Sequence, residues 1–214
     1  MSLPGRFITL EGSEGVGKST NLDFVCERLR RRGLEVVATR EPGGTPGAER
    51  IRELLLSADD DDPLDETAEL LLMFAARAQH LARLIRPALA RGAWVVSDRF
   101  TDATFAYQGS ARGLDPNVIA QLEALSQRGL KPDLTLWLDM PVGRASARLS
   151  LRGGDADRFE RQRGDFFEKV RDGYRQRAEG DPERIVRVDA DRSLAAVQAD
   201  IGAIIDSRLP AMTD

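Results

Sequence analysis

The stretch EGSEGVGKST, residues 11–20, decides the fold. Within it, Gly12, four further residues and then Gly17-Lys18-Ser19 match the pattern G-x-x-x-x-G-K-[ST]. The apolar segment RFITLE precedes the pattern, and STNLDFVCERL follows it with a helical spacing of apolar residues. The glycines let backbone N–H groups turn toward an anion, and a helix N-terminus adds partial positive charge. The sequence therefore predicts a phosphate-binding loop between a strand and a helix.

A loop of this kind binds a nucleoside triphosphate. Its lysine reaches the β- and γ-phosphates, and its serine hydroxyl ligates Mg²⁺. We therefore expect Lys18 to be a catalytic cation and Ser19 to be a metal ligand. The residues expected to surround the ATP phosphates are Gly12, Ser13, Glu14, Gly15, Val16, Gly17, Lys18, Ser19 and Thr20.

Short apolar runs rich in β-branched residues recur along the chain, separated by segments with helical periodicity. Near-continuous apolar strands at this spacing are typical of a parallel sheet covered on both faces. We expect one α/β domain over residues 1–214. Its longest helix should cover residues 66–91, where Pro87 either kinks it or begins a new turn. The expected strands are Phe7–Leu10, Leu34–Thr39, Ala93–Ser97, Leu134–Leu138 and Ile185–Val188.

Composition excludes several other classes of protein. The formal net charge is -4, which does not suggest a nucleic-acid polymer or a membrane surface as a partner. The chain has one cysteine, Cys26, and one histidine, His80, too few for an intrachain disulfide or a zinc centre of His and Cys ligands. No apolar run approaches membrane-spanning length, and MSLPGRF lacks the apolar segment of a signal peptide. We therefore expect a cytoplasmic protein.

Three classes of protein use this phosphate-binding loop: switch GTPases, motor ATPases and small-molecule kinases. A GTPase reads guanine with N-K-x-D, but neither Asn21 nor Asn117 precedes a lysine. A motor ATPase usually ends a strand in Asp-Glu, whereas WVVSDRF places Arg99 after Asp98. Asp98 is expected in the Mg²⁺ shell. A kinase is favoured, and a P-loop ATPase or nucleotide sensor acting on a protein partner is the alternative from another class.

Arginines at three places favour an anionic acceptor. Arg99 offers a planar fork suited to phosphate oxygens, and Arg40 lies in TREPGGT after the second strand. The segment RLSLRGGDADRFERQR, residues 148–163, is basic and interrupted by glycines, as expected of a lid that closes over phosphates. A phosphate monoester is largely dianionic near neutral pH, so it needs positive charge rather than a general base.

The segments EGSEGVGKST, TREPGGT, DRFTDATFAYQG and the arginine-rich lid together resemble the bacterial thymidylate kinase family. That resemblance implies the P-loop fold of nucleoside-monophosphate kinases, with a five-stranded parallel sheet. It also implies transfer of the γ-phosphoryl group of ATP to dTMP, with Mg²⁺ as cofactor, and a homodimer. A kinase for another nucleotide or for a deoxynucleoside remains the runner-up.

The resemblance also implies roles around the transferred group. Glu14 matches the acidic residue near the sugar 3′-hydroxyl and the acceptor. Arg40 and Arg99 match residues that hold the dTMP phosphate, and Asp98 matches the acid of the metal shell. Where one branch of the family carries a catalytic arginine in the loop, this chain has Gly15. The chain thus resembles the branch with catalytic lid arginines, where Arg152 is the first choice and Arg148 and Arg158 support it.

Roles at the nucleoside follow from the same resemblance. Arg77 matches a base-contacting arginine, and Thr104 and Gln108 match positions that face the thymine edge. Tyr107 matches the aromatic residue that crowds the ribose 2′ position and so favours deoxyribose. Either Phe74, three residues before the base-contacting arginine, or Met73, four before it, faces the thymine ring.

Overall fold

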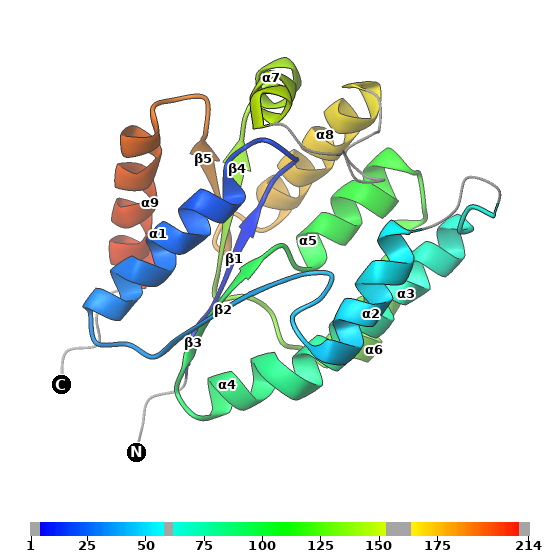
Figure 1. Ribbon diagram of the computed structural model, residues 1–214, viewed down its shortest axis with the longest axis horizontal. Helices are drawn as coiled ribbons and strands as arrows, with labels where there is room; N and C mark the ends of the chain where they lie inside the picture. The colour runs from blue at the N-terminus through cyan, green and yellow to red at the C-terminus, as the bar shows by residue number, and fades with distance from the viewer. Residues whose placement is uncertain (1–4, 58–61, 153–163, 210–214) are drawn as a thin grey trace.

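The structure, a computed structural model, describes residues 5–57, 62–152 and 164–209. Its centre is a five-stranded parallel sheet of order β2-β3-β1-β4-β5, with helices on both faces (Figure 1). The predicted α/β fold is confirmed. β1 lies between β3 and β4, so the crossovers on its two sides leave in opposite directions and open a crevice at the carboxyl ends of the strands. The strands are β1 Phe7–Glu11, β2 Val36–Arg40, β3 Trp94–Asp98, β4 Leu134–Asp139 and β5 Ile185–Asp189.

Helix α1 confirms the helix predicted after the phosphate-binding loop. α1 ends two residues before Gly33, which has a φ of 78°. None of the helices in the described ranges is long and apolar enough to cross a membrane. The helices are α1 Lys18–Arg31, α2 Pro46–Leu56, α3 Glu66–His80, η1 Leu81–Ile85, α4 Arg86–Ala90, α5 Thr101–Thr104, η2 Phe105–Ala111, α6 Pro116–Gln127, α7 Val142–Arg152, α8 Gly164–Gly180 and α9 Leu194–Arg208.

The predicted long helix 66–91 is built from three segments. After α3, five residues form a π-helical turn, η1, and α4 then begins with Pro87 in its first turn. Pro87 has no N–H to donate, so it is tolerated at a helix start and not in a helix interior. The π turn widens the helix just before the proline, and the amide of Arg86 bonds five residues back to the Leu81 carbonyl.

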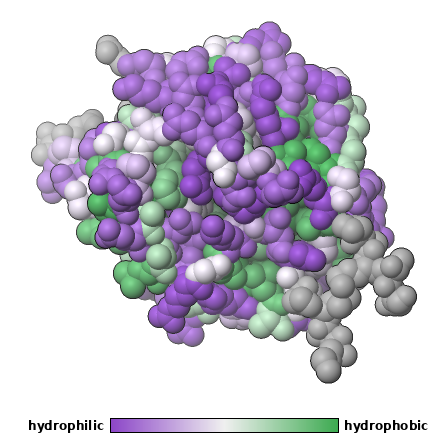
Figure 2. Space-filling view, turned by 180° about the vertical axis from the view of Figure 1, so that it is seen from behind, coloured by the Kyte–Doolittle hydropathy of each residue, from purple (hydrophilic) through white to green (hydrophobic). Residues whose placement is uncertain are grey.

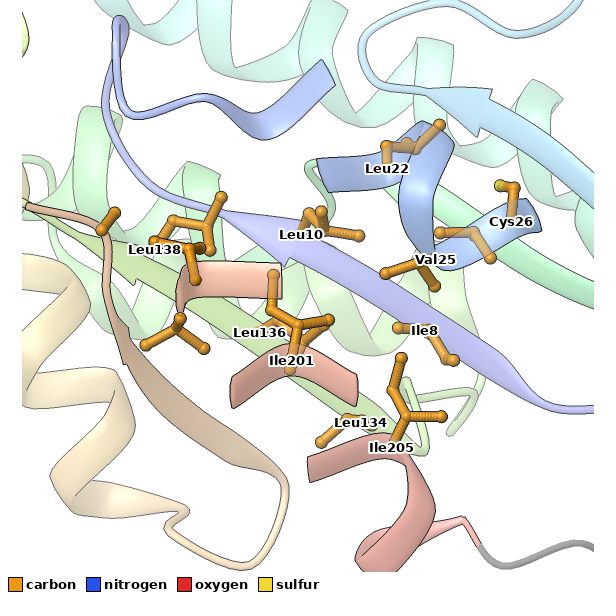
Figure 3. Close-up of a cluster of buried hydrophobic side chains, with 14 of the residues drawn as sticks. Ile8, Leu10, Leu22, Val25, Cys26, Leu134, Leu136, Leu138, Ile201 and Ile205 are labelled. Carbon is orange, nitrogen blue, oxygen red and sulfur yellow. The ribbon is translucent and has the colours of Figure 1, made fainter. Parts of the chain in front are cut away.

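Successive side chains of β1 point to opposite faces of the sheet, so β1 contributes to both layers of the core. Ile8 and Leu10 point toward α1 and α9, where they pack with Val25, Ile201 and Ile205 (Figure 3). Phe7 lies on the opposite face against the Phe100 ring, with their centroids 4.9 Å apart. The apolar residues thus fix the sheet between its helical layers and leave the carboxyl ends of the strands for polar residues.

Glu11, the last residue of β1, is fully buried on the second face. Its carboxylate accepts hydrogen bonds from the Phe100 amide at 2.8 Å and from the Tyr174 hydroxyl at 2.8 Å. Burial, reinforced by the nearby Asp102 carboxylate, raises the pKa of Glu11 to about 8. Glu11 therefore connects β1 with the segment that follows β3 and with α8, directly before the phosphate-binding loop.

This raised pKa predicts a loss of stability with rising pH. Between about 4.5, the ordinary pKa, and about 8, native Glu11 keeps a proton that the unfolded chain releases. The free energy of unfolding should therefore fall across this window, by up to about 1.4 kcal/mol per pH unit. Glu11→Gln should remove this dependence. Urea unfolding of both proteins at several pH values measures it, with exposed Glu66→Gln as the control. Parallel pH profiles would contradict the assignment.

Candidate active site

The phosphate-binding loop has the backbone that its glycines predict. Gly12, Gly15 and Gly17 have φ values of 135°, 79° and 92°, a region that favours glycine. A Cβ at Gly15 would lie 2.3 Å from the Ala145 carbonyl oxygen, because the loop packs directly on the start of α7. This packing leaves no room for a side chain at the position where one branch of the resembled family carries an arginine.

Lys18 lies in the first turn of α1 and points back into the loop. Its buried Nζ donates to the Ser13 carbonyl oxygen at 2.8 Å. Burial, with repulsion from Arg99, lowers the pKa of Lys18 to about 8, against the opposing effect of nearby carboxylates. Phosphate oxygens at the loop would favour the charged form of Lys18.

The groups available for a metal ion fit Mg²⁺ bound with a nucleotide. Within the described residues, Asp98 Oδ1 is buried without a hydrogen-bond partner, whereas Ser19 is exposed at the start of α1. An unpartnered buried carboxylate oxygen suits an oxygen-preferring cation. The described ranges contain no cluster of three or more His, Cys, Asp or Glu that could hold a metal. Such a site therefore draws most of its ligands from phosphates and water.

Arg99 links the loop to the space beyond it. Its Nη2 donates to Glu14 Oε1 at 2.7 Å and to the Tyr107 hydroxyl at 3.0 Å, and that hydroxyl donates to Glu14 Oε2 at 2.7 Å. The backbone of Arg99 has a φ of 68°, unusual for an arginine. Its amide donates to the Leu10 carbonyl at 2.9 Å, and Ser97 Oγ donates to its carbonyl at 2.8 Å. These bonds hold the unusual backbone that aims the guanidinium at Glu14.

Beyond Arg99 lies a cavity open to solvent, with about 600 Å³ of space outside the protein atoms. Apolar side chains from α2, α3 and α5 form much of its wall, and charged groups stand at both ends. It is lined by Glu14, Glu41, Pro42, Arg52, Leu56, Met73, Arg77, Arg99, Phe100, Ala103, Thr104, Tyr107 and Gln108.

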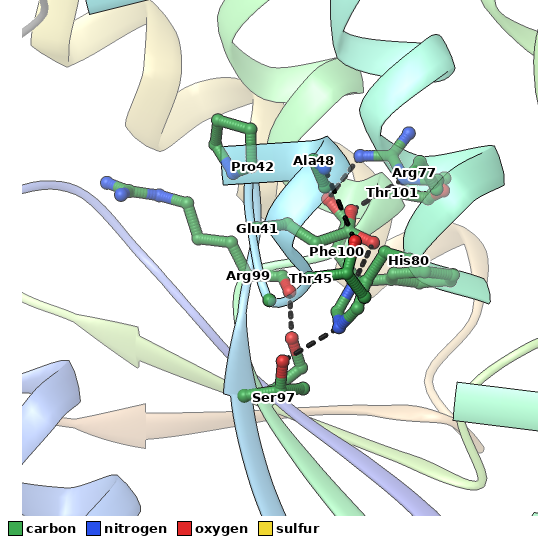
Figure 4. Close-up of polar contacts among 12 residues, drawn as sticks. Glu41, Pro42, Thr45, Ala48, Arg77, His80, Ser97, Arg99, Phe100 and Thr101 are labelled. Atoms are coloured by element: carbon green, nitrogen blue, oxygen red, sulfur yellow. Dashed lines mark hydrogen bonds and ion pairs between the residues drawn. The ribbon is translucent and has the colours of Figure 1, made fainter. Parts of the chain in front are cut away.

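Arg77 stands at the end of the cavity away from Arg99, as Figure 4 shows. Its Nε donates to Glu41 Oε2 at 2.7 Å, and its Nη2 donates to Thr104 Oγ1 at 3.0 Å. Glu41 Oε1 also contacts His80 Nδ1 at 3.0 Å, and His80 Nε2 lies 2.7 Å from Thr39 Oγ1. Among the residues that the structure describes, Arg77 Nη1 is buried without an acceptor. One donor therefore remains for a ligand.

Gln108 provides the second polar group at this end. Its Nε2 donates to Glu69 Oε1 at 3.0 Å, and Glu69 Oε2 accepts from Arg112 Nη2 at 3.1 Å. Both Gln108 and Glu69 are almost completely buried. The sequence analysis gave no role to His80 or Glu69. Each contacts a cavity-lining side chain and does not line the cavity itself, and no local sequence motif marks such a residue.

Most predicted acceptor-site residues line the cavity, and two do not. Arg40 has a 55% exposed side chain paired with Glu49, and Phe74 packs in the core with Leu70 and Ile119. Met73, the other candidate for facing the base, lines the cavity. Arg52 of α2 also lines the cavity and was not predicted, although its place two helical turns after TREPGGT was a usable signal.

Of the predicted lid, residues 148–163, the structure describes only residues 148–152. α7 leads into it, α8 follows it, and residues 153–163, with Arg158, lie outside the described residues. Arg152 is the last residue of α7, and its side chain is likewise outside the description. Arg148 Nη1 donates to the Ala190 carbonyl at 3.1 Å, which ties α7 to the loop after β5.

Comparison with known proteins agrees with this geometry. The family model described as "Thymidylate kinase" matches residues 10–201. The chain is 69% identical over 206 residues to a thymidylate kinase of Chromohalobacter salexigens, covering 96% of this chain and 97% of the relative. It is 60% identical over 203 residues to one of Pseudomonas putida, covering 95% and 96% respectively.

A solved structure shows the same likeness in three dimensions. The crystal structure of thymidylate kinase from Ehrlichia chaffeensis aligns with a TM-score of 0.77 at 31% identity. The alignment covers 95% of this chain and 100% of that one. With a family model matched over most of its length and close relatives matched end to end, the chain belongs to the thymidylate kinase family.

Proposed function

We propose that this chain transfers the γ-phosphoryl group of ATP to dTMP, giving dTDP and ADP for dTTP synthesis, and that the cavity beyond Arg99 holds dTMP. The observation that carries this proposal is the pattern of donors and acceptors at the far end of the cavity. Arg77 Nη1 and the Thr104 hydroxyl, which already accepts from Arg77, can donate, whereas Gln108 Oε1 can accept.

That pattern suits the edge of thymine, with its carbonyl oxygens on either side of an N–H group. Cytosine instead presents an amino group and a bare ring nitrogen, so it offers a donor where the arginine also donates. A site built around buried polar groups rejects a ligand that leaves them unpaired. Met73 supplies an apolar contact beside this edge.

The phosphate of dTMP would then lie near Arg99 and the phosphate-binding loop. Arg99 and Arg52 both line the cavity and can bind phosphate oxygens as planar forks. The role of Arg40 at the same phosphate stays a prediction. The Glu14 carboxylate and Tyr107 hydroxyl lie between the loop and the base end, where a sugar would join the two. We assign Glu14 to the 3′-hydroxyl and Tyr107 to the exclusion of a 2′-hydroxyl.

ATP would bind through the loop amides and Lys18, with Ser19 and Asp98 in the shell of Mg²⁺. When bound, Mg²⁺ neutralises charge on the β- and γ-phosphates. An oxygen of the dTMP phosphate is the nucleophile. The protein must therefore bring two anions together and compensate their charge. Lys18 and Arg99 supply positive charge on either side of the transferred group, and the lid arginines supply the rest.

We also propose a homodimer located in the cytoplasm. Leu71 of α3 and Leu125 of α6 are 51% and 73% exposed, and Val118 of α6 is 44% exposed. Apolar side chains of this size on the outer surface of neighbouring helices are available to a second copy. Figure 2 shows the rear face of the molecule, where apolar patches lie among a mostly hydrophilic surface.

Measuring ADP release with ATP and Mg²⁺ tests the acceptor assignment. We expect the kcat/KM for dTMP to exceed the values for dUMP, dCMP, dGMP, UMP and thymidine. The preference over dCMP and UMP should be large, because those compounds change the base edge or add the 2′-hydroxyl. Equal turnover of all acceptors would contradict the base and sugar contacts. ATP hydrolysis that does not depend on any acceptor would favour the sensor alternative.

The lid assignment predicts the behaviour of Arg152→Ala. If the guanidinium acts on charge that develops in transfer, kcat should fall by about a hundredfold or more, with little change in the KM for dTMP. Steady-state kinetics measures both constants. Arg144→Ala is the matched control, because Arg144 is 68% exposed on the same helix and pairs with Asp191. A higher KM at unchanged kcat would make Arg152 a binding residue instead.

A further inference from the structure

Glu69 is a buried carboxylate that touches the edge of the proposed base site without lining the cavity. It lies on α3 with 1% exposure, beside Gln108 of η2. Its Oε1 accepts from Gln108 Nε2 at 3.0 Å and lies 2.9 Å from Arg112 Nε. Its Oε2 accepts from Arg112 Nη2 at 3.1 Å. Glu69 therefore bridges a cavity-lining amide and an arginine behind it.

This bridge fixes which end of the Gln108 amide faces the cavity. A carboxylate paired with an arginine accepts hydrogen bonds and cannot donate them. If the amide turned by 180°, its Oε1 would face Glu69 Oε1, and two buried acceptors would be left without a hydrogen between them. The NH₂ end is thereby held against Glu69. Gln108 Oε1 has no partner in the part of the chain that the structure describes, so it is left as an acceptor for a ligand.

We propose that Glu69 is a specificity-determining residue that acts by positioning the Gln108 amide. By holding the NH₂ group away from the cavity, Glu69 makes the site accept a pyrimidine whose ring nitrogen carries hydrogen, as in thymine and uracil. It also makes the site reject cytosine, whose ring nitrogen is an acceptor facing the Gln108 oxygen. The proposal rests on the assignment of the cavity as the base site.

Glu69→Gln tests this directly, because the new amide can either donate or accept. Gln108 is then free to present its NH₂ group to a cytosine ring nitrogen. The readout is the ratio of kcat/KM for dUMP to that for dCMP, two acceptors that differ only at the base edge. We expect this ratio to fall by at least about tenfold in Glu69→Gln, the size of one good hydrogen-bonded discrimination. The KM for ATP should not change.

Two further variants separate positioning from general damage. Glu66→Gln, on the same helix but exposed and outside the cavity, should keep the wild-type ratio. The double variant Glu69→Gln/Arg112→Gln removes both charges of the Glu69–Arg112 pair. If thermal unfolding shows that Glu69→Gln alone is unstable, the double variant should show the same lowered ratio of kcat/KM for dUMP to that for dCMP.

The outcomes distinguish this inference from the base-site assignment. If Gln108→Ala lowers the dUMP to dCMP ratio but Glu69→Gln and the double variant do not, Glu69 has no positioning role and the base site stands. If the folded Glu69 variants lower kcat for both acceptors equally, the role of Glu69 is structural and the inference is overturned. If Gln108→Ala leaves the ratio unchanged, both the inference and the base-site assignment fail.

Discussion

The ion pair between Arg99 and Glu14 joins the two halves of the site. Glu14 belongs to the phosphate-binding loop after β1, and Arg99 follows β3, the neighbouring strand. The contact exists because Arg99 has a left-handed backbone, held by bonds to Leu10, Ser97 and, through the next amide, Glu11. The pairing of β1 with β3 therefore sets the distance between the phosphate-binding loop and the cavity beyond Arg99.

Helix α8, which follows the segment predicted as a lid, is anchored to the same edge of the sheet. Along α8, Arg171 donates to Asp139 at the end of β4 at 2.6 Å, and Tyr174 donates to Glu11 at the end of β1. One turn later, Arg177 donates to buried Asp102 at 2.8 Å. These three contacts join α8 to the ends of β4 and β1 and to α5.

The sequence predicted the sheet and the loop because each has a local signal, whereas the predicted cavity residues came from the family resemblance. Apolar runs located all five strands, and the glycine spacing located the loop. Each predicted strand nevertheless stopped short of its last residue, which is charged in every case. A charged residue after an apolar run does not show from the sequence whether it continues the strand. The terminal residues are Glu11, Arg40, Asp98, Asp139 and Asp189.

Side-chain direction was the part that sequence could not supply. Met73 and Phe74 are neighbours on one helix, and only tertiary packing decides that Met73 faces the cavity. Arg40 was placed at the acceptor by its motif, but its side chain pairs with Glu49 outside the cavity lining. The contacts of Glu41 with His80 and of Glu69 with Gln108 join residues 39 positions apart in the chain. No local pattern marks such pairs.

The most direct test of the central claim is a crystal structure with dTMP and a non-hydrolysable ATP analogue. The account predicts the thymine N–H within hydrogen-bond distance of Gln108 Oε1, with a carbonyl oxygen at Arg77 Nη1. It also predicts the dTMP phosphate between Arg99 and the triphosphate held by the loop. A base lying outside this cavity, or a phosphate that does not contact Arg99, would contradict the account.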